Sequence, residues 1–123
     1  MKKFNPSSTH PDRAVQAWQI LVGAAMSRQT LTYKGLGELM YHRQAQGVLD
    51  KILGHIAFYC IDQKLPPLTS IVVGLGRGTP GKDIPMDLAL RDKERERVYA
   101  CDWYDIYPPG GDAMHKSYLR HIQ

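Results

Sequence analysis

A glycine-rich, basic segment between Gly74 and Asp83 holds the residues that come nearest to a chemical motif. Its second part, GRGTPGKD, almost matches the loop Gly-x-x-x-x-Gly-Lys-[Ser/Thr] that cradles phosphate groups. Asp83 stands where a Mg²⁺-binding hydroxyl belongs, and Pro80 removes an amide donor. The segment therefore favours a basic turn in which Arg77 and Lys82 contact phosphates. An enzyme with a phosphate ligand at this turn is a less favoured alternative.

No other group of residues in the sequence predicts catalysis or metal binding. Cys60 and Cys101 lie far apart in the chain, so they match neither a paired-cysteine zinc site nor a disulfide framework. Asp102 and Asp105 flank a tryptophan and are expected to be an ordinary solvent-exposed pair. The five histidines also lack the spacing of a metal site. These are His10, His42, His55, His115 and His121. For these reasons we expect no enzymatic activity and no cofactor.

Length and charge are typical of a small soluble domain. The chain has 123 residues, enough for one hydrophobic core, and a formal net charge of +4, which suits an acidic partner such as nucleic acid. The N-terminus has two lysines but no apolar core of a signal peptide, and no window approaches a membrane span. We expect a cytoplasmic protein with no membrane association, whose oligomeric state the sequence leaves open.

Three helices are predicted in the first half of the chain. Residues 1–11 are polar, contain two prolines and predict a flexible arm, after which Pro11 and Asp12 are suited to a helix start. Thr32 is expected to cap a second helix that continues to Met40. The third helix is predicted over Gln44 to Gln63, with Gly54 marking close packing and His55 at the edge of the core. The residues expected to face inward are Val15, Trp18, Leu21, Val22 and Ala25, then Leu36, Leu39 and Met40, then Val48, Leu49, Ile52, Leu53, Ile56, Tyr59 and Cys60.

A strand and a helical tail are predicted beyond the third helix. Residues 69–73 are rich in β-branched side chains and predict a buried strand, and the glycine-rich turn follows it. A further helix is expected from Pro85, and the alternating charges of residues 91–97 are typical of a solvated helix face. A short tail helix is expected from Asp112. The aromatic residues expected to fold back on the core are Tyr99, Trp103, Tyr104 and Tyr107.

This order of elements predicts an α+β fold, a small winged helix-turn-helix-like domain with a C-terminal helix and an aromatic closing segment. We expect residues 12–123 to form a single domain behind the N-terminal arm. In such a domain the third helix and the turn after the strand lie on one side, where together they form a surface for nucleic acid.

The segments AWQIL (residues 17–21) and LTYKGL (residues 31–36), the glycine-bearing third helix and the strand after it resemble a known family. They are similar, over residues 15–81, to the DNA-binding domain of alkylguanine-DNA alkyltransferases and alkyltransferase-like proteins. The resemblance implies that Tyr33 approaches the DNA backbone and that an arginine near position 47 fills the base stack. This chain has Gly47 there, with Arg43 one turn earlier and Lys51 one turn later.

The chain also departs from this family at the residue that carries its chemistry. The family's Pro-Cys-His-Arg motif should follow the strand, where this sequence reads VGLGR from Val73 to Arg77. Cys60, on the apolar side of a helix, is expected to be a buried and inert thiol. The sequence therefore predicts a non-catalytic DNA-binding or accessory module without the acceptor cysteine. The residues expected to contact DNA are Tyr33, Arg43, Gln44, Gln46, Lys51, Arg77 and Lys82.

A protein partner is the main alternative on the same fold. The polar side of the third helix is also compatible with a solvated face, since Asp50 makes its charge mixed. Aromatic residues concentrate at protein interfaces, and Tyr41, His42 and Tyr59 are candidates for an exposed patch. An inhibitor or an immunity-type partner of a larger enzyme would fit this interpretation.

Overall fold

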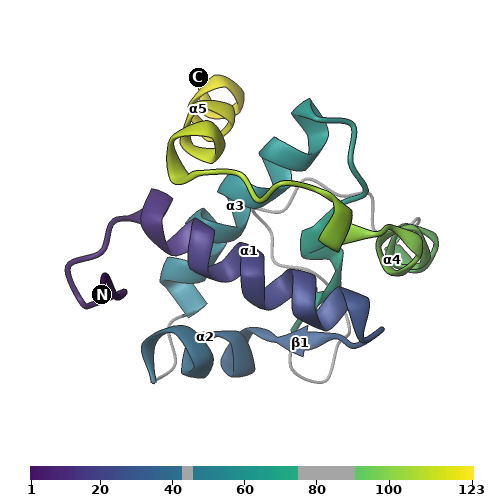
Figure 1. Cartoon of the computed structure of the whole chain (residues 1–123), viewed down its shortest axis with the longest axis horizontal. Coiled ribbons are helices and arrows are strands. Elements are labelled where there is room, and N and C mark those ends of the chain that lie inside the picture. The colour runs from purple at the N-terminus through teal and green to yellow at the C-terminus, as the bar shows by residue number, and fades with distance from the viewer. Residues whose placement is uncertain (43–45, 75–90) are drawn as a thin grey trace.

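The computed structural model describes residues 1–42, 46–74 and 91–123. Across these ranges the chain is mostly helical, with five α-helices, two short 3-10 helices and a parallel sheet of two short strands. Figure 1 shows α1 crossing the middle of the molecule, with α2 and β1 along one edge and α5 at the opposite edge. The elements are α1 (His10–Met26), β1 (Leu31–Thr32), α2 (Tyr33–Tyr41), α3 (Gln46–Asp62), η1 (Leu68–Ile71), β2 (Val72–Val73), α4 (Arg91–Ala100), η3 (Trp103–Asp105) and α5 (Gly111–Ile122).

Helix α1 forms where the sequence places a cap, a proline and an acid together. The Thr9 hydroxyl accepts a hydrogen bond from the Asp12 amide, and Pro11 lies in the first turn, where its missing amide hydrogen is no loss. The predicted inward face is confirmed, because Leu21 and Ala25 are fully buried and Trp18 is almost so. Ser27 ends the helix, and the left-handed backbone of Arg28 turns the chain toward β1.

The third predicted helix supplies much of the core. Leu49, Ile52, Leu53 and Ile56 are completely buried on α3, as their spacing predicts. Val48 departs from the prediction, since 37% of it is exposed at the start of this helix. The apolar period gives the face of a helix but does not register where along the helix the packing against other elements ends.

The predicted strand over residues 69–73 is mostly wrong. Leu68–Ile71 form a 3-10 turn, in which the Ser70 amide donates to the Pro67 carbonyl, and only Val72–Val73 pair as a strand. Leu31 aligns with Val72 and Thr32 with Val73 in the parallel pair. Every residue of this turn is buried, so the β-branched residues indicated a buried segment and not an extended backbone.

The C-terminal elements close the core through one aromatic residue in particular. Trp103 is 1% exposed; its indole nitrogen donates to the Val98 carbonyl at 2.8 Å, and its ring meets Trp18 edge to face. Tyr104 and Tyr107 are 69% and 93% exposed, so their predicted packing on the core is wrong. Of the residues in the turn Trp103–Asp105, only Trp103 is buried in the core. The tail helix predicted from Asp112 is confirmed as α5.

The architecture agrees with the coarse prediction of a small domain with helices and a short sheet. Helices α1, α2 and α3 and the strand β2 follow one another in the predicted order, whereas β1, which the sequence did not predict as a strand, pairs in parallel with β2. Residues 75–83 of the expected turn, and the helix start expected at Pro85, lie outside the described residues, whereas the helical spacing predicted for residues 91–97 is confirmed by α4. Within the described ranges no helix has the length and apolar character needed to cross a membrane.

Candidate nucleic-acid interface

The start of α2 is fixed by a side-chain cap. The Thr32 hydroxyl accepts a hydrogen bond from the Gly35 amide at 2.9 Å, which satisfies one of the free donors at the helix N-terminus. A Cβ at Gly35 would lie only 3.1 Å from this hydroxyl oxygen, so glycine leaves room for the cap. Lys34 lies in the first turn of α2, two residues after the cap, and is exposed. The capping residue thus positions the only lysine of α2 at its solvent side.

Tyr33 belongs to the core rather than to the outer surface. It is 4% exposed, and its hydroxyl oxygen is buried as well. The family resemblance implies a tyrosine that approaches the DNA backbone at this position. In this arrangement Tyr33 supports the first turn of α2 from beneath, while the neighbouring Lys34 occupies the accessible position.

The end of α2 is held by a buried arginine of α1 that the sequence did not single out. Arg13 is 4% exposed; its guanidinium donates to the Met40 carbonyl at 3.0 Å and to the Asn5 carbonyl at 2.7 Å. The same group lies 4.3 Å from the centre of the Tyr41 ring. A cation at a helix C-terminus is stabilised by the helix dipole and by the unpaired carbonyls there. Arg13 therefore joins α1, the end of α2 and the N-terminal arm.

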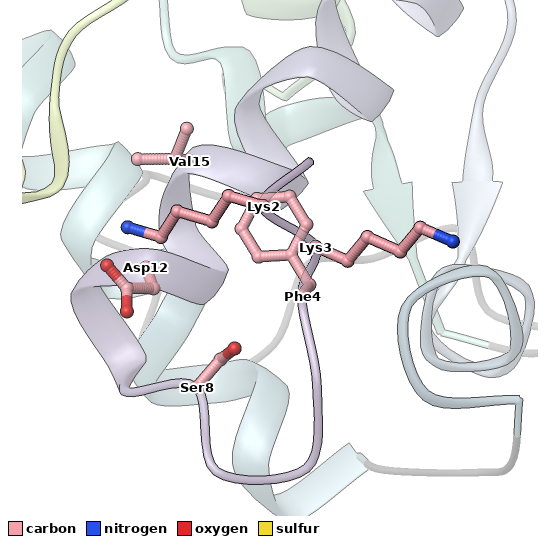
Figure 2. A pocket seen from close by; sticks show the side chains of 6 residues that line it. All are labelled: Lys2, Lys3, Phe4, Ser8, Asp12 and Val15. Atoms are coloured by element: carbon pink, nitrogen blue, oxygen red, sulfur yellow. The ribbon is translucent and has the colours of Figure 1, made fainter.

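The N-terminal arm, predicted to be flexible, runs beside α1 in Figure 2. Between them lies a pocket of about 300 Å³, lined by residues of the arm and of the first turns of α1. Figure 2 shows the ammonium groups of Lys2 and Lys3 pointing in opposite directions, with the Phe4 ring between them. Because the two charges diverge, this pocket does not gather them around a single anion.

Helix α3 carries an exposed lysine and an exposed glycine in its first half. Lys51 is exposed, as is Gly47 one turn earlier. A Cβ added at Gly47 would meet no atom within 4 Å. Lys34 and Lys51 form no ion pair with any residue in the described ranges. The two helices that pack together therefore each carry a cation available to an external anion.

The structure brings only part of the predicted contact set into view. Lys51 is exposed on α3 and Tyr33 is buried on α2. Gln46 is the first residue of α3, and its side chain is not among the described ones. The remaining predicted contacts fall at positions outside the described residues, namely Arg43, Gln44, Arg77 and Lys82.

The predicted aromatic patch for a protein partner is not an exposed patch. Tyr59 is half-buried and meets the Trp18 ring edge to face at 5.8 Å. Tyr41 is half-buried beneath Arg13, and only His42 is exposed. The exposed apolar residue on α2 is instead Leu39, of which 56% is exposed although it was predicted to face inward. Leu36 and Met40 satisfy the short helix's contact with the core, which leaves Leu39 on the outer side.

Among the described residues, one group of serine, histidine and aspartate side chains lies at the contact of α3 with α5. Asp62 accepts hydrogen bonds from both His121 and Ser117, which leaves the carboxylate between the imidazole and the hydroxyl. In a nucleophilic triad the imidazole must stand between the other two groups. Burial raises the pKa of the Cys60 thiol to about 12, so this thiol stays protonated at neutral pH, as its apolar position predicted. In the described part of the chain, no three potential ligands converge as a metal site.

Similarity to known proteins adds nothing to this picture. No protein-family model, curated protein or solved structure matches the chain. The interpretation of the site therefore rests on the residues and their geometry.

Proposed function

We propose that this chain is a non-catalytic DNA-binding or accessory module that contacts duplex DNA through α2 and the first half of α3. The observation that carries the proposal is the pair of exposed cations Lys34 and Lys51, which have no ion-pair partner in the described ranges and lie on two helices that pack together. Cations without a protein partner release condensed counterions when they meet phosphates, which drives binding. The net charge of +4 acts in the same direction.

The anchoring of α2 at both ends supports this use of the surface. Thr32 caps its start, and Arg13 holds its end against α1. A helix fixed in this way presents Lys34 without a further cost of ordering the helix backbone on binding. Phosphate contacts of this kind position a protein on DNA without reading its sequence, so we propose binding with little sequence preference. From the sequence, Arg43, Gln44, Gln46, Arg77 and Lys82 would extend this surface, and Tyr33 would support it from within.

The test is a salt series of duplex binding, measured by fluorescence anisotropy, with the unmodified chain and the double variant Lys34→Glu/Lys51→Glu. We expect the variant to lose affinity at least tenfold at low salt. The slope of log affinity against log salt should fall by about 0.9 for each phosphate that the variant no longer neutralises. Lys116→Glu is the control for net charge. It makes the same change in charge as either single substitution, at an exposed position of α5 on the opposite edge of Figure 1. Equal binding by the double variant, or no binding by the unmodified chain at low salt, would exclude the proposal.

A protein-binding module, such as an inhibitor or an immunity-type partner of a larger enzyme, is the second candidate. It is favoured by the exposed apolar residues Leu39 and Val48, which lie on the same two helices. Apolar groups of this size add little to phosphate binding but are suited to a protein interface. In this case a pull-down from native cells should recover one stoichiometric protein after nuclease treatment, and Leu39→Asp should abolish its recovery. Recovery that depends on nucleic acid would favour the first candidate.

A further inference from the structure

Histidine side chains lie at the centre of the contact between α3 and α5. His55 of α3 is 1% exposed, and its ring stacks on the ring of Tyr118 at 4.2 Å between centroids. The ring of His115, also on α5, lies nearly parallel to the His55 ring, with 5.2 Å between the ring centroids. A Cβ at Gly54 would approach Tyr118 to 3.1 Å, so the missing side chain lets α5 come this close. The stack is therefore part of the contact that seats α5.

The hydrogen bonds of His55 determine where its proton lies. Nδ1 of His55 is 2.8 Å from the Lys51 carbonyl oxygen, which can only accept, so Nδ1 donates. Nε2 of His55 is 3.1 Å from Nδ1 of His115 and must accept a hydrogen from it. The pair is satisfied when His55 is neutral. A second proton on His55 would place a positive charge where the side chain is 1% exposed, and the bond between the helices would then need His115 to move its own proton to Nε2.

The charged surroundings of His55 also oppose its protonation. Burial lowers its pKa from the ordinary value near 6.5; the bond to the Lys51 carbonyl raises it, and positive charge on His115 or on His10 of α1 lowers it further. Asp62 lies farther along α3, where it accepts hydrogen bonds from Arg120 and His121 of α5. No carboxylate in the described ranges pairs with His55 to offset a positive charge there.

We propose that the stacked pair His55 and His115 makes the docking of α5 on α3 a pH-dependent latch, which is closed at neutral pH and opens in weak acid. Protonation stabilises the form in which His55 meets water, and His55 meets water only when α5 moves away. The direction of the effect follows from linkage, because the open form binds more protons than the closed one. The latch is thus closed above about pH 6.5 and weakens as the pH falls below that value.

Hydrogen exchange of the unmodified chain at pH 7.5 and 5.5, corrected for the intrinsic rate, measures the latch. We expect the protection of α5 amides to fall by up to about tenfold for each pH unit below 6.5, while α1 amides keep theirs. In a parallel NMR titration, the ring of His55 should titrate below the ordinary value near 6.5. Unchanged α5 protection, an equal loss in α1, or titration of His55 at or above that value would overturn the proposal.

Two variants complete the experiment. His55→Gln cannot be protonated but keeps an acceptor for His115, so its α5 protection should not change between the two pH values. His42→Asn is the matched control, because His42 is exposed at the end of α2 and its left-handed backbone tolerates asparagine. This control should keep the full pH dependence of the unmodified chain. A His55→Gln variant that still loses α5 protection in acid would contradict the role given to His55.

Discussion

The two halves of α3 differ in what their polar side chains contact. In the first half Lys51 is exposed and without an ion-pair partner in the described chain. In the second half His55 and Asp62 are bonded to residues of α5. Burial and neighbours separate the two cases, since a solvated cation is free to meet an external anion while an enclosed imidazole is held neutral. One helix thus joins a proposed binding surface to a structural contact.

The largest expected effect compares a buried and an exposed apolar residue on this helix. Leu53 is fully buried and Val48 is 37% exposed. Leu53→Ala should lower the free energy of unfolding by about 2–5 kcal/mol, because it leaves a cavity in the core. Val48→Ala should lower it by less than about 0.5 kcal/mol. Urea unfolding of both variants measures the difference, and equal losses would contradict the placement of Val48 outside the core.

The next effect concerns the arginine that holds the proposed surface in place. Arg13→Met keeps the apolar stem but removes the donors to the Met40 and Asn5 carbonyls. We expect a loss of about 1–3 kcal/mol in unfolding free energy, measured by urea unfolding. Arg120→Met removes an arginine that is 62% exposed, and it should cost at most about 1 kcal/mol. A result in the reverse order would show that Arg13 does not anchor α2.

A gain of function would sharpen the comparison between α3 and the rest of the surface. Gly47→Arg adds a cation near the start of α3, in space where an added Cβ meets nothing. We expect a severalfold gain in duplex affinity at low salt and a steeper salt dependence by about 0.9. Gly23→Arg on α1 is the matched control, since it also meets open space and adds the same charge. Equal gains from both variants would point to net charge rather than to α3.

The smallest effect tests the far end of the contact between α3 and α5. Hydrogen bonds from His121, Arg120 and Ser117 hold the pKa of Asp62 well below its usual value, against the effect of burial. A lowered pKa stabilises the fold above the ordinary value near 3.9, and this contribution is lost as the pH falls further. Asp62→Asn should therefore cost up to about 1 kcal/mol at pH 6 and a smaller amount near pH 2. Chemical unfolding at the two pH values measures it.

Much of the helical framework was predictable because it depends on local signals. The apolar spacing of α1 and α3, the cap at Thr32 and the proline in the first turn of α1 act within a few residues of one another. The inertness of Cys60 followed from the same spacing, since a cysteine in an apolar helical stripe is buried. These predictions needed no knowledge of distant contacts.

The sequence by itself determined the helices, the buried faces of α1 and α3, and the absence of a recognisable catalytic motif, because periodicity and capping are local properties. Only the tertiary structure decided that Leu39 is exposed, that Arg13 is buried, and that His55 meets His115 sixty residues away. Such outcomes depend on which elements pack together, and residues far apart in the chain carry no periodic sign of their eventual neighbours.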